Sequence, residues 1–204
     1  NVKTYLNNLQ ELSPNILIFS INSPGGTVSA SKELYDIIKD FKKNNELEII
    51  FHTNELLASG AYWASMSGDK VYANYGSIIG SIGVKGPNWF FYDQPKSISN
   101  GIFGNTIETD KGIKVYSKTA GKSKDMLNPF RKPTYQELEH MQKMVDEIYV
   151  DFVQVVSKQR TIERNLIKNE IGALVYSTKS AKKLHLIDKE ISLDNLIKKI
   201  LKEK

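Results

Sequence analysis

Residues 56–68, LLASGAYWASMSG, are the most informative stretch of the chain. The preceding residues 47–53 are apolar and include β-branched side chains, which predicts a buried strand. The small and aromatic residues 61–66 predict a buried helix. Ser59 and Gly60 therefore lie at a strand-to-helix junction, where a turn can aim a hydroxyl at a cleft and a helix N-terminus offers free N–H groups. The alternative is a serine that only caps a core helix.

The composition indicates one α/β domain over residues 1–204. The net charge of +5 is modest, and no basic run with interleaved aromatics is present, so we expect no nucleic acid partner. An anionic membrane surface fits the same charge equally well. The chain has no cysteine, which excludes disulfides, thiol nucleophiles and cysteine metal sites. We expect neither a metal nor a cofactor.

The N-terminus indicates a cut or processed piece, because residue 1 is Asn and not Met. No signal peptide is visible, and no apolar run approaches the ~20 residues that span a bilayer. We therefore expect the chain to lack an upstream membrane anchor.

The first half of the chain alternates between strand and helix patterns. Residues 1–12 predict a short amphipathic helix, residues 15–22 a strand buried on both faces, and residues 27–43 an amphipathic helix. With the strand before Ser59 and the helix after it, these elements form a βαβα unit, which predicts a parallel sheet with right-handed crossovers.

The second half predicts short strands and one long helix. Thr134 and Glu137 form a capping box that opens a helix over residues 134–158. Residues 86–112 are rich in Gly, Asn, Pro and aromatics and are expected to be irregular. Short strands are predicted at residues 70–73, 78–84, 113–118 and 173–176.

A second motif, SPGG at residues 23–26, follows the first strand directly. A glycine pair there presents two unobstructed N–H groups at the carboxyl edge of the sheet, where open α/β sheets bind ligands. The alternative is a simple tight turn. Combined with Ser59, the motif predicts that Gly26 and Gly60 each deliver an N–H to a point beside the serine hydroxyl. That arrangement is an oxyanion hole with a nucleophile.

A serine nucleophile needs a base, and three histidines are available. We interpret His52 as a core residue, His140 as part of the long helix and His185 as a helix-end residue, because none has a carboxylate at a recognisable spacing. A desolvated lysine can act as the base instead.

Five stretches of the chain form a recognisable series: SPGG at 23–26, ASGAY at 58–62, GSIGV at 80–84, AGKSKD at 120–125 and NPFR at 128–131. With these motifs the chain resembles the signal peptide peptidase A family, serine peptidases with a Ser/Lys dyad on a ClpP/crotonase-like fold. The resemblance continues through the long helix to residue 188 and covers most of the chain.

The resemblance implies an α/β fold with a ClpP/crotonase-like core, in which helices flank a mostly parallel sheet. It implies that Ser59 is the nucleophile and that Lys124 is the general base. Gly26 and Gly60 would form the oxyanion hole, and Ser81 would orient the lysine.

The chain departs from the family pattern in two places. Alanine follows Gly60 where a second glycine is usual, and Lys124 lies 65 positions after Ser59, with the extra length in an insertion at about residues 86–112. Within this insertion, Trp89, Phe90 and Phe91 begin a run of four aromatics. We expect them to form an apolar rim at the substrate entrance and to contact a neighbouring protomer; the alternative is local packing.

The function implied is hydrolysis of peptide bonds in short, unfolded or leftover signal peptides. The resemblance also implies a ring-shaped homo-oligomer and a membrane-associated, extracytoplasmic location. Three alternatives stay open. They are a membrane-protein-specific peptidase of the NfeD type, a crotonase-like acyl-CoA binding or hydrolysing protein, and an inactive scaffold.

Overall fold

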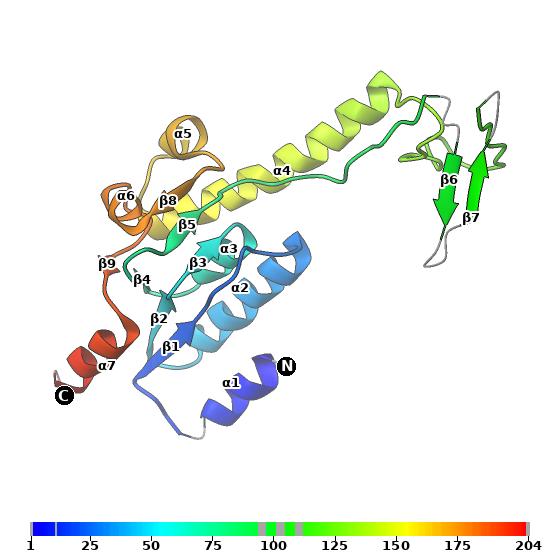
Figure 1. The fold of residues 1–204 in the computed structure, drawn as a ribbon. Helices are drawn as coiled ribbons and strands as arrows, with labels where there is room; N and C mark the ends of the chain where they lie inside the picture. Colours follow the sequence, from blue (N-terminus) through cyan, green and yellow to red (C-terminus); the bar gives the residue numbers. More distant parts are fainter. Residues whose placement is uncertain (1, 11, 94–96, 101–104, 109–111, 203–204) are drawn as a thin grey trace. The chain divides into compact units, whose positions relative to one another are not determined.

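The computed structural model describes residues 2–10, 12–93, 97–100, 105–108 and 112–202. It divides into two compact units. The first unit comprises Asn1–Val84 and Ile148–Lys204, and the second comprises Lys85–Glu147. Figure 1 traces the elements in chain order.

The first unit is built on a four-stranded parallel sheet in the order β1-β2-β4-β9, which confirms the predicted parallel sheet. Its strands are β1 (Ile16–Ser20), β2 (Glu48–Thr53), β4 (Lys70–Ala73) and β9 (Lys189–Glu190). The prediction that β1 is buried on both faces was wrong: its first four residues are half-buried and Ser20 is exposed, because β1 is the outermost strand in this order.

A second, three-stranded sheet in the order β3-β5-β8 carries the Ser59 junction. β3 runs parallel to β5, and β8 runs antiparallel to it. The strands are β3 (Leu56–Ala58), β5 (Ile78–Gly80) and β8 (Val175–Ser177). β5 is shorter than predicted because Gly80 and Ser81 have φ angles of 128° and 55°, which end the extended conformation.

Helices cover these sheets in the first unit. Thr27 caps α2 by accepting a hydrogen bond from the Ala30 N–H over 3.3 Å. The helices are α1 (Val2–Gln10), α2 (Val28–Lys43), α3 (Gly60–Ser65), α5 (Arg164–Leu166), the π-helix η1 (Ile167–Ile171), α6 (Thr178–Lys183) and α7 (Leu193–Lys202). The core includes the buried side chains of Leu6, Ile38, Phe51, Tyr62 and Phe152.

The long helix α4 (Tyr135–Arg160) begins at the predicted capping box. The Thr134 N–H donates to Glu137 Oε2 over 2.9 Å, and the Glu137 N–H donates to Thr134 Oγ1 over 3.2 Å. The boundary between the two units falls within this helix. In the first unit, Phe152 stacks on Trp63 with ring centroids 4.6 Å apart.

Two predictions in the second unit were wrong. Residues 86–112 were expected to be irregular, but they contain an antiparallel pair, β6 (Ser97–Asn100) and β7 (Asn105–Glu108). Residues 113–118 alternate between apolar and polar types but form no strand, because no described strand pairs with them. In the described part of the chain, no helix combines the length and apolar character needed to cross a membrane.

Candidate active site

Ser59 joins β3 to α3 in a strained backbone conformation, with φ 52° and ψ −127°. Its N–H donates to the Gly80 carbonyl over 2.9 Å, and its carbonyl accepts from the Trp63 N–H over 3.0 Å. A non-glycine residue in such a conformation costs on the order of 1–3 kcal/mol, so the surrounding structure must enforce it. The Ser59 hydroxyl makes no capping bond to α3. Ser59 is therefore the N-cap residue of α3 by position, but its side chain does not cap the helix.

The glycine pair of the SPGG motif lies directly against this junction. The Ser23 N–H donates to the Leu56 carbonyl over 2.7 Å, and the Ser23 carbonyl accepts from the Ala58 N–H over 3.1 Å, so the motif runs alongside β3. Gly25 has a φ of 113°, and a Cβ there would lie only 2.8 Å from the Ser59 Cβ. A side chain at position 25 is excluded by both conformation and space.

Gly60 is equally confined, and it lies where the two motifs meet. A Cβ on Gly60 would lie 2.0 Å from Ser31 Oγ and 3.3 Å from the Gly26 nitrogen. Ser31 is buried in the first turn of α2, where its hydroxyl donates to the Thr27 carbonyl over 2.8 Å. The absence of a side chain at position 60 thus lets the main chains of Gly26 and Gly60 approach each other beside Ser59.

Ser81 lies at the end of the strand next to Ser59. Ala58 and Gly80 are register partners in β3 and β5, so the residues that follow them, Ser59 and Ser81, leave paired strands at the same edge. Both serines have positive φ angles. The Ser81 N–H donates to the Leu174 carbonyl over 2.7 Å, which fixes the turn after β5.

Lys124 lies in the second unit, within a series of turns that precedes α4. Its N–H donates to the Gly121 carbonyl over 3.3 Å, and its side chain is exposed. Lys122, the nearest lysine in the same motif, donates from Nζ to Gln136 Oε1 over 2.8 Å. No ion pair among the described residues includes Lys124.

Arg131 joins two carboxylates beside this loop. Its guanidinium bonds to Asp125 over 2.8 and 2.9 Å and to Glu137 over 2.9 and 2.7 Å. Glu137 is nearly buried, with 4% of its surface exposed. Hydrogen bonds from Arg131 and then from the Thr134 backbone hold the pKa of Glu137 far below its usual range, and Arg131 also lowers the pKa of Asp125.

The contacts that join Asp125, Arg131 and Glu137 were not predicted from the sequence. The capping box was the available signal for Glu137, because it places this carboxylate at the start of α4. Nothing in the sequence spacing indicated that Arg131 binds both Asp125 and Glu137.

The aromatic residues of the insertion fall into two groups. Trp89 donates from Nε1 to the Asn128 carbonyl over 3.1 Å, and the Arg131 guanidinium lies 5.0 Å from its ring centroid. Phe90 and Phe91 are 61% and 37% exposed, and Lys132 Nζ lies 5.6 Å from the Phe91 ring centroid. Trp89 therefore has local partners, whereas most of the Phe90 surface is open to solvent.

The three histidines differ in burial. His52 is buried in β2, and its Nε2 donates to the Ile191 carbonyl over 2.9 Å, which confirms the interpretation of a core residue. His140 is exposed on α4, and His185 is exposed just after α6. Within the described ranges, no three or more His, Asp or Glu side chains gather closely enough to hold a metal ion.

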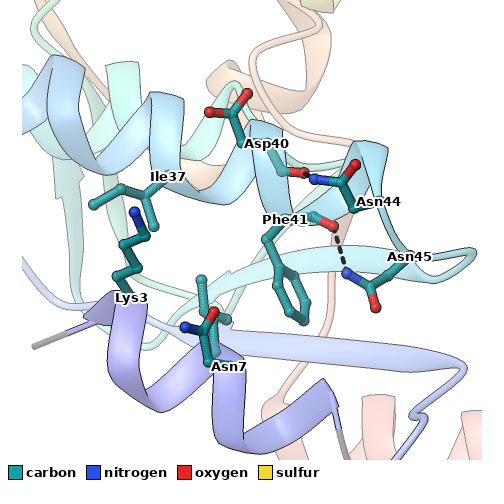
Figure 2. Close-up of a pocket in the computed structure, with 8 residues that line it drawn as sticks. Lys3, Asn7, Ile37, Asp40, Phe41, Asn44 and Asn45 are labelled. Carbon is teal, nitrogen blue, oxygen red and sulfur yellow. Dashed lines mark hydrogen bonds between the residues drawn. The ribbon is translucent and has the colours of Figure 1, made fainter.

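A hollow of about 460 Å³ between α1 and α2 shares no residue with the Ser59 site. Figure 2 shows its polar side chains: Asn44 Nδ2 donates to the Asp40 carbonyl over 2.9 Å, and Asn45 Nδ2 donates to the Phe41 carbonyl over 2.7 Å. These bonds satisfy carbonyls at the end of α2, which is a sufficient role for both asparagines.

The model of peptidase family S49 matches residues 42–204. A candidate protease of Methanocaldococcus jannaschii is 33% identical over 98% of this chain and 61% of its own length. A candidate signal peptide peptidase SppA of Enterococcus faecium is 30% identical over 97% of this chain and 55% of its own length. The chain thus spans about three fifths of these relatives.

Among solved structures, a single-residue mutant of ClpP1 from Listeria monocytogenes superposes with a TM-score of 0.58. The superposition covers 96% of this chain and 85% of that chain, at 16% sequence identity. At this identity the likeness concerns the fold alone. It confirms the predicted α/β fold with a ClpP-like core.

Proposed function

The chain belongs to peptidase family S49, and from this premise we propose that it is a serine-type endopeptidase with Ser59 as nucleophile and Lys124 as general base. The observation that carries the proposal is the strained junction at Ser59, whose hydroxyl does not cap α3 and which lies against two glycines of the SPGG motif. Strain of this kind persists where the surrounding structure enforces it, and it is concentrated at active sites.

In the proposed reaction, Ser59 Oγ attacks the peptide carbonyl carbon while the Lys124 amine accepts the hydroxyl proton. The carbonyl oxygen becomes an oxyanion that accepts hydrogen bonds from the Gly26 and Gly60 N–H groups. Each such donor contributes roughly 10²–10³-fold to the rate. The C–N bond then breaks, and the lysine returns its proton to the leaving amine. A water molecule hydrolyses the acyl-serine by the same steps.

Ser81 is assigned to orienting the lysine. Its position next to Ser59, at the end of the paired strand β5, supports this assignment. A hydroxyl is suited to the role because it is neutral. A carboxylate in its place would stabilise the protonated ammonium and remove the base.

The substrates that we propose are short, unfolded or leftover signal peptides at a membrane surface. The Enterococcus faecium relative is named a signal peptide peptidase, which supports this class, and the fold likeness to ClpP supports a ring-shaped homo-oligomer. Trp89, Phe90 and Phe91 are proposed to line the apolar rim of the substrate entrance. The exposed Phe90 is the strongest support for that rim. The catalytic domain is assigned to an extracytoplasmic, membrane-associated location.

A fluorophosphonate probe tests the nucleophile directly. We expect mass spectrometry to find the label on Ser59, and we expect Ser59→Ala to lose both the label and peptide cleavage. Ser20→Ala, which changes an exposed serine at the end of β1, is the matched control and keeps both. The proposal is wrong if Ser59→Ala cleaves a mixed peptide library as the parent does. Turnover of acyl-CoA thioesters without peptide cleavage identifies the crotonase-like alternative.

A further inference from the structure

We propose that Arg131 is a positioning residue for Lys124: it locks the loop that carries the lysine, and it binds the two adjacent carboxylates so that neither pairs with the amine. The inference rests on the proposed function, in which Lys124 is the general base. Arg131 acts through Asp125 and Glu137 and does not itself need to touch substrate.

The loop around Lys124 is not held by regular secondary structure. Its turns are closed by single bonds, such as the Met126 N–H to the Ser123 carbonyl at 3.0 Å and the Asn128 N–H to the Asp125 carbonyl at 3.1 Å. Ser123 and Leu127 have φ angles of 59° and 70°, which are unfavourable for residues other than glycine. Contacts outside the loop backbone must therefore maintain this conformation.

Arg131 supplies those contacts. Its Nε and Nη2 bond to the two oxygens of Asp125, and its Nη1 and Nη2 bond to the two oxygens of Glu137. The planar guanidinium matches two bidentate carboxylates in a way that a lysine ammonium cannot. Trp89 lies against the same guanidinium, with its centroid 5.0 Å from the central carbon.

The side chains of the two residues that flank Lys124 in the sequence both point to the cluster of Asp125, Arg131 and Glu137. Asp125 bonds to Arg131 directly, and the Ser123 side chain lies near enough to Glu137 to help lower the pKa of this carboxyl group. Glu137 is in turn fixed to the start of α4 through Thr134. The backbone on each side of Lys124 is thus anchored to α4, which leaves the lysine side chain as the free part of the loop.

The cluster also controls the charge around the lysine. The charged groups around the lysine include Asp125, Arg131 and Glu137. Two further lysines have other partners: Lys122 donates a hydrogen bond to Gln136, and Lys132 lies over the Phe91 ring. A free carboxylate within about 4–6 Å of an amine favours its protonated form. Because Arg131 binds all four carboxylate oxygens, Asp125 does not pair with Lys124 although the two are adjacent.

The test measures the proton affinity of Lys124 without relying on catalysis. In a Ser59→Ala chain, the rate of Lys124 acetylation by acetic anhydride is followed by mass spectrometry as a function of pH. We expect Arg131→Met to raise the pH midpoint by ~1 unit, because the released Asp125 carboxylate then faces the amine. Adding Asp125→Asn to Arg131→Met returns the midpoint toward that of the parent.

Two further variants keep the test decisive. Arg131→Lys retains the positive charge but loses the planar guanidinium that binds both carboxylates. We expect it to raise the pH midpoint of Lys124 acetylation by less than Arg131→Met does, and it provides the test if Arg131→Met does not fold. Arg160→Met removes another arginine that binds a carboxylate, Asp188 in the first unit, and we expect it to lower stability without moving the midpoint. The inference is overturned if neither Arg131 variant shifts the midpoint relative to Arg160→Met.

In the chain that retains Ser59, Arg131→Met should lower kcat by roughly 10²-fold, since misplacing a catalytic group by about 1 Å has that effect. KM should change little, and the pH at which the rate rises should move with the acetylation midpoint, because only the deprotonated amine acts as a base. Failure of the proposed function is distinguishable: it appears as activity that survives Ser59→Ala, whatever the acetylation midpoints are.

Discussion

The two units hold their candidate catalytic residues by different means. Ser59 is fixed by main-chain hydrogen bonds and by two glycines, Gly25 and Gly60, which are packed so closely that neither has room for a side chain. Lys124 lies on an exposed loop that is held by charged side chains around Arg131. Main-chain bonds do not titrate, whereas carboxylates do. The first unit should therefore be sensitive to added volume, and the second to changes in charge and pH.

The largest effect is expected at Lys124 itself. Lys124→Ala should lower peptide cleavage by ~10³-fold, because general-base catalysis contributes about 10²–10⁴-fold. Lys122→Ala removes only the bond to Gln136 and should stay within a few-fold of the parent. Steady-state cleavage of a fluorogenic peptide compares the two. A dead Lys122→Ala together with a fully active Lys124→Ala would show that the base is misassigned.

Gly60→Ala should have the next largest effect, because the new Cβ would lie 2.0 Å from Ser31 Oγ. Overpacking of this kind costs ~1–3 kcal/mol of unfolding free energy, and the shift of the main chain should disturb Ser59 and lower kcat. A Cβ on Gly26 meets nothing within 4 Å, so Gly26→Ala should unfold in urea at the concentration of the parent.

Adding Ser31→Ala to Gly60→Ala removes the nearest clashing atom and should recover part of the stability, since the next contact is the Ser31 Cβ at 3.0 Å. If Gly26→Ala and Gly60→Ala are equally stable, then close packing does not distinguish the two glycines.

The sequence predicted the first unit better than the second, and the reason is physical. The parallel sheet, α2 and the Ser59 junction follow from apolar periodicity and glycine turns, which act over short distances along the chain. β3 escaped prediction because it is only three residues long, and Asn54 and Glu55 separate it from β2, so it has no periodicity of its own. The short β6–β7 pair has no strong apolar alternation, and its strands satisfy each other's backbone groups.

The candidate site shows the same contrast. Ser59, Gly26 and Gly60 could be brought together from sequence because they follow neighbouring strands of an expected sheet. The contacts of Arg131 could not be predicted, because they join Asp125 and Glu137 across a loop with no periodicity. Charged side chains on long stems reach partners that sequence spacing does not define.

The loop around Lys124 should loosen in acid while the first unit stays folded. The pKa values of Glu137 and Asp125 are lower in the folded state than in the unfolded state, where they are ~4. The ionised carboxylates therefore stabilise the loop fully above about pH 4, and this stabilisation is lost as the pH falls through the folded-state pKa values. Trp89 lies on Arg131, and in a Trp63→Phe chain it is the remaining tryptophan. Its fluorescence should change below about pH 4.

Glu137→Gln in the same Trp63→Phe background is the control for this acid transition. The amide keeps the shape of the carboxylate but does not titrate, so most of the pH dependence of the Trp89 signal should disappear. An unchanged transition in Glu137→Gln would mean that other carboxylates control the loop.

The smallest effect is expected from substitutions of the exposed aromatic residues. Comparing their effects on stability and on KM distinguishes local packing from contact with the substrate. Phe90→Ser should leave the urea midpoint within error of the parent, because 61% of this side chain is already exposed. Trp89→Ser should lower it, since the indole loses its bond to the Asn128 carbonyl and its contact with Arg131. An aromatic side chain that serves the substrate should instead affect KM.

We therefore expect Phe90→Ser combined with Phe91→Ser to raise KM for apolar peptides by about 5-fold, because apolar contacts on a solvent-exposed rim contribute about 1 kcal/mol, the low end of the range for an apolar contact. Polar peptides of the same length are the matched control and should be cleaved as by the parent. Sedimentation of the parent and of the double variant tests the other proposed role of these side chains, which is contact with a neighbouring protomer. If assembly and the apolar-to-polar KM ratio are both unchanged, the two phenylalanines take part in neither substrate binding nor assembly.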